Sequence, residues 1–297
     1  MPAHRPLFHF THFVLLGCFW GLSPSLYKLM GEAGVPVLHI IVLTGFGVGI
    51  ALGAIGAARS QTFTLRREVL VFGFGCGAIM NVPFGLSLLF ARHVPPAEYA
   101  LIVSTAPFFN YVVALIGGRE RGQLRRLIAV GTGFVSGAIL VLSRNGMESE
   151  TVSAWLPAAF VVPIIYTLYN WFAARFWPRN ADVLAVGTAE SIFSGLVALP
   201  LLLVFAPFGA EVASAFGYWL VVATTVIWII ERITFFTLIR DKGALYTIQA
   251  VYVATPAGVV FALLIFGGNG DPWIWASLAL LMVALWLNNR QPATERG

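Results

Sequence analysis

Long apolar runs of about twenty residues follow one another through almost the whole chain of 297 residues. A run of that length is what an α-helix needs to cross the hydrocarbon core of a bilayer. Only 10% of the residues are charged, whereas a typical soluble domain has about 25%. These features predict an all-α membrane protein and exclude a water-soluble fold. Because the runs do not alternate between apolar and polar residues, they also exclude an outer-membrane barrel.

Charged and turn-forming interruptions divide the chain into ten expected transmembrane helices. The expected spans are 10–30, 35–57, 68–90, 96–116, 126–143, 154–176, 183–205, 216–239, 243–266 and 272–288. The connections between them are too short for an extramembrane domain, so we expect one integral membrane domain. The first run is long enough to span and leads directly into the second, so we do not interpret it as a cleavable signal peptide.

The basic residues predict the orientation of the chain. With the N-terminus in the cytoplasm, only Arg92 and Arg144 of the 18 Lys and Arg residues fall on the outside, and Lys28 and Arg232 fall within spans. All the others are cytoplasmic, which is a strong positive-inside signal. It places both termini in the cytoplasm and makes the protein multi-pass in the cytoplasmic (inner) membrane. It also accounts for the formal charge of +5 without a nucleic-acid partner.

Ten spans form two five-helix repeats, which we place at residues 1–148 and 149–297. An odd number of spans per repeat gives the two repeats opposite orientations. Spans four and nine each carry a proline, Pro107 and Pro256, eleven residues before a glycine. Inverted repeats around a central cavity are typical of secondary transporters.

Three groups of residues resemble one transporter family. The first span contains Phe19-Trp20-Gly21, then Pro24 and Lys28. The fourth span has Pro107 near its middle, and Gly118-Arg119-Glu120-Arg121 follows its end. The fifth span carries Gly133 and Gly137. Together they resemble the EamA type of the drug/metabolite transporter superfamily, over the whole chain. Gly267-Gly268-Asn269 departs from the family pattern, which usually repeats an acidic residue there.

The resemblance implies a ten-helix exporter of small metabolites, often amino acids, with a central cavity between inverted halves. We therefore expect a secondary transporter that works by alternating access, and aromatic amino acids are the leading substrates. A multidrug exporter or an exporter of other metabolites is the alternative. A membrane signalling or structural protein is the alternative outside transport. Substrate identity, proton coupling against facilitated diffusion, oligomeric state and the most stable conformation stay open.

Helical spacing predicts which side chains face the cavity, since residues at i, i+3, i+4 and i+7 share a helix face. Polar groups within spans must face the bundle interior or a wet cavity. The expected substrate-binding residues are Trp20, Pro24, Asn81, Phe84, Tyr99, Asn110, Tyr166, Tyr169, Asn170, Trp228, Tyr246, Gln249 and Tyr252. Aromatic rings with a few amides and hydroxyls suit a small amphipathic ligand. The competing interpretation is an interfacial aromatic belt, with Tyr99 its first candidate and Tyr252 its last.

Charged residues within spans indicate function more sharply, because each costs about 2.5–3.5 kcal/mol at a helix centre. Glu190 and Arg232 lie at matching depths in the hairpin of spans seven and eight, so we predict that they form an ion pair. Glu231 has three open roles: a partner of Arg232, a proton carrier or a ligand of a substrate amine. The alternative for all three residues is a static structural contact.

Two further features concern gating and packing. At the outer end of the first span, Lys28 is expected to latch against Glu98 of the fourth, or else to snorkel to the interface. Gly45, Gly49 and Gly53 form a stripe of small residues on the second span, which suits close helix packing.

The absence of several motifs narrows the function. The sequence has no G-x-x-x-x-G-K-[ST] phosphate loop, so the chain is not itself an ATP-driven pump. Its two cysteines, Cys18 and Cys76, lack metal-ligand spacing, so we expect neither a metal nor a cofactor. Asp182, Asp241 and Asp271 all sit at span ends and no catalytic set is visible, so we do not expect an enzyme.

Overall fold

A computed structural model describes residues 5–59, 64–116, 124–144, 155–206, 213–267 and 271–289. These residues are almost entirely helical, and none of them is in a β-strand. The helices are α1 Arg5–Glu32, α2 Val37–Arg59, α3 Arg67–Phe90, α4 Pro96–Val103, α5 Ala106–Ile116, α6 Leu124–Arg144, α8 Val161–Arg175, α9 Val183–Phe205, α10 Ala215–Ile248, α11 Val251–Phe266 and α12 Pro272–Asn289. The predicted helical class is therefore confirmed.

The described part of the chain contains several membrane-spanning candidates. Seven segments are long and apolar enough to cross a bilayer: Phe8–Glu32, Val37–Arg59, Arg67–Phe90, Trp155–Arg175, Val183–Phe205, Ala215–Gly243 and Tyr246–Phe266. The other three expected spans fall on the pair α4 and α5, on α6, and on α12, whose apolar part is Pro272–Leu287. The chain is thus a multi-pass helical membrane protein, and the count of ten spans stays a prediction.

Proline interrupts two of the expected spans. Pro107 has no backbone N–H to donate to the carbonyl four residues earlier, and its ring crowds that carbonyl. The chain therefore turns at Ser104 and Thr105, where Phe108 N–H donates to the Thr105 carbonyl oxygen over 2.9 Å. A second turn, at residues 159–160, comes just before Pro163 and separates a short helical segment at 155–158 from α8.

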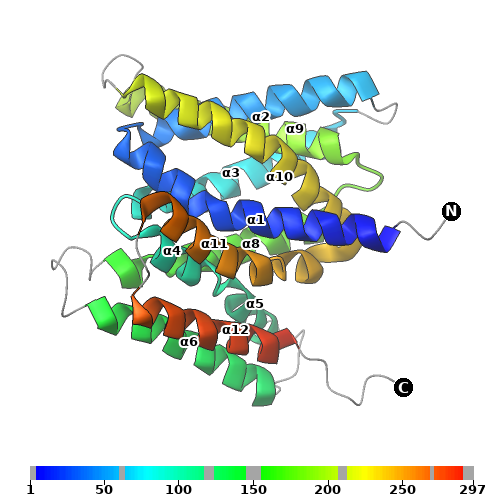
Figure 1. Ribbon diagram of the computed structural model, residues 1–297. Coiled ribbons are helices and arrows are strands. Elements are labelled where there is room, and N and C mark those ends of the chain that lie inside the picture. The colour runs from blue at the N-terminus through cyan, green and yellow to red at the C-terminus, as the bar shows by residue number, and fades with distance from the viewer. Residues whose placement is uncertain are drawn as a thin grey trace, which may run out of the picture.

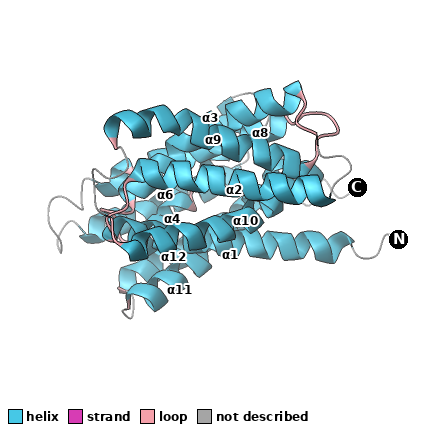
Figure 2. Ribbon diagram, turned by 90° about the horizontal axis from the view of Figure 1, so that it is seen from above, coloured by secondary structure: helices cyan, strands magenta, loops and turns pink. Residues whose placement is uncertain are grey.

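The helices run side by side along one main direction (Figure 1). The helix α9 packs against both α2 and α3, and α1 packs against α10 and α11. The helices α6 and α12 pair at the edge of the bundle that lies farthest from α2 in Figure 1. The start of α1 and the end of α12 lie at the same end of the bundle (Figures 1 and 2).

Hydrogen bonds show which connections between helices lie at the same end of the bundle. At one end, Arg66 Nη2 donates to the Arg179 carbonyl oxygen over 3.4 Å. At the other end, Arg92 Nη2 donates to the carbonyl oxygen of Val35 over 2.7 Å. The predicted topology puts Arg66 and Arg179 on the cytoplasmic side and Arg92 and Val35 on the outer side. Both contacts agree with this alternation of the connections between the two sides of the membrane.

The glycine stripe of α2 is a close helix contact. A Cβ atom at Gly45 would lie 2.8 Å from the backbone nitrogen of Gly195, and one at Gly49 would lie 2.6 Å from a side-chain carbon of Ile192. Gly53 is looser, since its Cβ would be 3.4 Å from Thr188. All three neighbours belong to α9, so the predicted small-residue packing surface is confirmed and its partner is identified.

Candidate functional site

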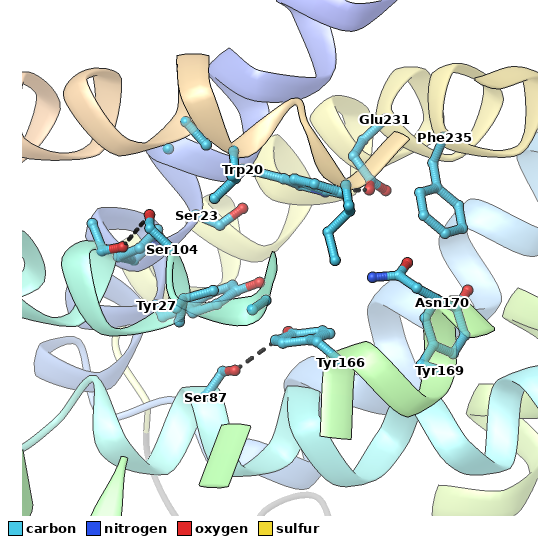
Figure 3. A pocket seen from close by; sticks show the side chains of 18 of the residues that line it. Trp20, Ser23, Tyr27, Ser87, Ser104, Tyr166, Tyr169, Asn170, Glu231 and Phe235 are labelled. Atoms are coloured by element: carbon cyan, nitrogen blue, oxygen red, sulfur yellow. Dashed lines mark hydrogen bonds between the residues drawn. The ribbon is translucent and has the colours of Figure 1, made fainter. Parts of the chain in front are cut away.

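A central cavity lies where both halves of the chain meet (Figure 3). It is lined from α1, α3, α4, α5, α8, α10 and α11. Trp20 stands at the middle of the segment Phe8–Glu32, and Trp228 stands beside the middle of Ala215–Gly243, so the cavity lies at mid-span. Its volume is about 120 Å³, counted as the space that the centre of a water molecule can occupy. One water needs about 10–15 Å³ on that measure, so the space suits a solute of roughly amino-acid size.

Nine of the residues proposed from the sequence line the central cavity: Trp20, Pro24, Tyr99, Tyr166, Tyr169, Asn170, Trp228, Glu231 and Arg232. Tyr99 is only 1% exposed, so it is not the interfacial belt residue that its place near a span end suggested. It is buried because α4 packs against α1 and α11. The other aromatic rings in this group form the apolar wall.

Six of the expected substrate-binding residues lie elsewhere. Asn81 faces α9, where its side chain donates to the Ser194 carbonyl oxygen over 2.9 Å. Phe84 is buried behind the wall, with its ring 4.6 Å from that of Trp228. Tyr252 donates its hydroxyl to the Leu285 carbonyl oxygen of α12.

The remaining three of these residues are also absent from the cavity lining. Tyr246 packs against Phe13 of α1, with the two ring centroids 5.4 Å apart and the rings tilted by 55°. Asn110 is half-buried in α5. Gln249 caps the end of α10. Proline and glycine breaks near these residues change the helix phase, so spacing within a continuous helix misplaced them.

Several lining residues were missed by the sequence analysis: Ser23, Met80, Ser87 and Ser104. Met80 and Ser87 are seven positions apart and share a helix face with Phe84. An anchor at Met80 rather than at Asn81 would have found this face. Small hydroxyl residues carry little signal, because serine in a span commonly bonds to its own helix backbone.

Three charged side chains meet beside the cavity. Arg232 Nε lies 3.2 Å from Glu190 Oε2, so the predicted ion pair is present. Arg232 Nη1 lies 3.8 Å from Glu231 Oε2. Glu190 is fully buried and does not line the cavity, whereas Glu231 and Arg232 do. Trp20 Nε1 donates to Glu231 Oε1 over 3.0 Å, which links the first half to the second (Figure 3).

Hydroxyl groups supply most of the remaining polarity. Ser23 and Ser104 donate to carbonyl oxygens of their own helices over 2.8 and 2.7 Å, so their lone pairs stay available as acceptors. The Tyr99 and Tyr169 hydroxyl groups, both buried, have no hydrogen-bond partner among the described residues. Buried polar atoms normally find a partner, so this cavity is suited to water or a polar ligand.

The outer latch differs from its prediction. Lys28 Nζ lies 3.6 Å from Glu32 Oε1, one turn further along α1. No ion pair among the described residues joins Lys28 to Glu98, which is buried at the start of α4. Helical spacing of four residues makes the local pair the nearer one.

No three His, Cys, Asp or Glu side chains come together as a metal-binding group in the described ranges. Cys18 and Cys76 are free cysteines, and Cys76 is buried.

Comparisons with known proteins address the fold. No family profile matches the sequence, and no curated protein is similar to it at the sequence level. One solved structure, described only as "Crystal structure of protein", superposes with a TM-score of 0.64 at 18% identity, over 97% of this chain and 98% of the other. At that identity the likeness shows a shared fold alone. Fold and site together define a multi-pass helical membrane protein with a mid-span cavity.

Proposed function

We propose that the protein is a secondary transporter, not an enzyme, that exports small metabolites across the cytoplasmic membrane by alternating access. Amino acids, aromatic ones among them, are its leading substrates. The observation that carries this proposal is the position of the cavity at mid-span between helices of both halves. A substrate site near the bilayer midplane between repeats is typical of secondary transporters. Export of drugs or other metabolites is the alternative for the same cavity.

The packing of the helices supports the proposed inverted repeat over residues 1–148 and 149–297. When the five expected spans of one half are matched in order with those of the other, α2 packs against its counterpart α9, and α6 against α12. The helix α1 packs on α10 as its counterpart α8 packs on α3. The helix α3 packs on α9 as its counterpart α10 packs on α2. Exchange of the two halves thus preserves these contacts, as a pseudo-twofold axis requires.

Alternating access needs two ends that can open in turn, and contacts between α1 and α10 close one of them. At the end where α1 begins, His9 Nε2 lies 3.1 Å from Asp241 Oδ2 of α10, and the ring of Phe13, one turn further along α1, packs against that of Tyr246. We assign this end to the cytoplasm, as the positive-inside distribution predicts. Rocking of one half against the other would break these contacts and expose the cavity.

Counterflow in proteoliposomes tests the transport function. Vesicles are loaded with unlabelled phenylalanine, supplied with a trace of labelled phenylalanine and challenged with other amino acids. Accumulation above protein-free vesicles is expected for a carrier, and competition ranks its substrates. A folded protein that accumulates no labelled phenylalanine would contradict phenylalanine transport and would favour export of drugs or other metabolites, or the signalling or structural alternative.

A further inference from the structure

We propose that the central cavity selects its solute by a protonated amine, with Glu231 as the counter-ion, and that the solute needs no carboxylate. The solute class is an amphipathic monocation whose apolar part is about the size of an aromatic ring. This inference rests on the transport function proposed above and deepens it, because it names the group that the cavity recognises.

The first argument is a count of charges. Glu190, Glu231 and Arg232 bring two carboxylates and one guanidinium together within the bundle. Arg232 makes its closer contact with Glu190, at 3.2 Å, and its contact with Glu231 is longer, at 3.8 Å. With both carboxylates ionised the cluster carries one negative charge in excess, and Glu231 is the carboxylate of the two that lines the cavity. A charge within a membrane is normally paired.

The second argument is that a solute carboxylate would find no free cation. Of the described residues that line the cavity, Arg232 is the only one with a positive charge, and it already lies against two carboxylates, those of Glu190 and Glu231. A solute carboxylate would have to share Arg232 with both of them, and its other donors would be neutral, such as the Asn170 amide, which points into the cavity (Figure 3). For an ammonium group, in contrast, the cavity offers the Glu231 carboxylate, and elsewhere in its wall the hydroxyl lone pairs of Ser23 and Ser104.

The third argument is the aromatic surround of Glu231. The ring centroids of Trp20 and Phe235 are 6.2 Å apart, and those of Tyr169 and Phe235 are 5.8 Å apart. All three rings line the cavity (Figure 3). Aromatic faces attract cations through their quadrupoles, most strongly where water is excluded. A carboxylate beside aromatic rings recognises an ammonium group by both charge and ring face.

A matched ligand series tests the inference on the purified, full-length protein in detergent. Phenethylamine, L-phenylalanine and 3-phenylpropionate share a phenyl ring on a two-carbon chain, and they carry an amine, both groups, and a carboxylate, respectively. Thermal stability is measured against the concentration of each. Phenethylamine and phenylalanine are expected to raise the melting temperature with half-saturating concentrations within about tenfold of each other, and 3-phenylpropionate to have no effect.

Variants assign the effect to Glu231. Glu231→Gln keeps an oxygen acceptor for the Trp20 N–H but removes the charge, so phenethylamine should bind at least tenfold more weakly. Glu68→Gln is the matched control, because Glu68 is exposed in the first turn of α3; its binding should equal that of the parent. If Glu231→Gln does not fold, Glu231→Asp replaces it, because aspartate keeps the charge at a shorter reach. Glu231→Asp should bind phenethylamine more weakly than the parent, but by less than the tenfold expected for Glu231→Gln.

Three results would overturn the inference: no shift with phenethylamine, an equal shift with 3-phenylpropionate, or undiminished amine binding by Glu231→Gln. Counterflow separates this failure from failure of the proposed function. Transport of phenylalanine that phenethylamine does not inhibit would reject the amine site and keep the transporter. Binding of phenethylamine with no counterflow of any amine or amino acid would keep the site and reject the transporter.

Discussion

The indole N–H of Trp20 donates a hydrogen bond to the Glu231 carboxylate over 3.0 Å, across the cavity wall from α1 to α10. A hydrogen bond to a charged group contributes about 1.5–3 kcal/mol. This bond holds the carboxylate at the cavity surface and joins a helix of each half. Its position makes it sensitive to any relative movement of α1 and α10.

Trp20→Phe should keep the apolar wall and remove only this donor. We expect the counterflow rate per folded molecule to fall about tenfold, which corresponds to about 1.4 kcal/mol. Trp273→Phe is the control, because Trp273 is 50% exposed at the start of α12 and does not line the cavity. Equal rates for the two variants would show that the hydrogen bond has no role in transport.

Glu190→Gln should destabilise the fold more than it impairs transport per folded molecule. Glu190 is fully buried against Arg232, and removal of one partner from a buried pair typically costs about 3–5 kcal/mol. Because Glu231 lies 3.8 Å from the same guanidinium, we expect the lower end of that range. Melting in detergent measures the effect, with Glu68→Gln as control. Equal melting temperatures for Glu190→Gln and the parent would count against a stabilising ion pair.

Gly45→Ala should weaken the contact between α2 and α9, whereas Gly53→Ala should be tolerated. The new Cβ at position 45 would lie 2.8 Å from the Gly195 backbone nitrogen, and the one at position 53 would lie 3.4 Å from the Thr188 side chain. Backbone cannot yield as a side chain can, and overpacking costs typically about 1–3 kcal/mol. Thermal melting compares the two variants. Equal melting temperatures for the two variants would mean that α2 and α9 can move apart to accommodate the added methyl group at position 45.

A reversible cross-link between positions 9 and 241 should arrest transport. The variant carries His9→Cys on α1 and Asp241→Cys on α10, in a chain in which Cys18 and Cys76 are replaced by serine. In the parent, His9 Nε2 and Asp241 Oδ2 lie 3.1 Å apart. A short methanethiosulfonate reagent would tie these ends together, and a reductant would release them. Counterflow should stop with the link and return after reduction. Undiminished counterflow in the linked protein would exclude an opening at this end.

Much of the fold follows from local sequence chemistry. The expected spans coincide with helices because an apolar run can enter lipid only with its backbone hydrogen bonds made internally. The buried pair of Glu190 and Arg232 was also predictable, because two costly charges at equal depth in neighbouring spans have few other partners. The α4–α5 break at Ser104, ahead of Pro107, has the same local origin.

The cavity lining followed only partly. Trp20, Tyr166 and Trp228 were found because aromatic rings at helical spacing mark a face, and the structure brings those faces together. Asn81 and Tyr252 point away, toward α9 and α12. One position along a helix turns a side chain by about 100°, so a choice between adjacent residues decides whether a group meets the ligand or a neighbouring helix.

The sequence by itself thus determined that the chain is a membrane protein. It also determined which segments form helices and which residues place a charge in the apolar interior. Tertiary structure decided what each helix face meets, including the contact of Asn81 with α9 and the approach of Trp20 to Glu231. The physical reason is that hydropathy and hydrogen bonding act within one segment. The rotation of a helix about its axis is set by close packing against other helices, such as the glycine contacts of α2 with α9.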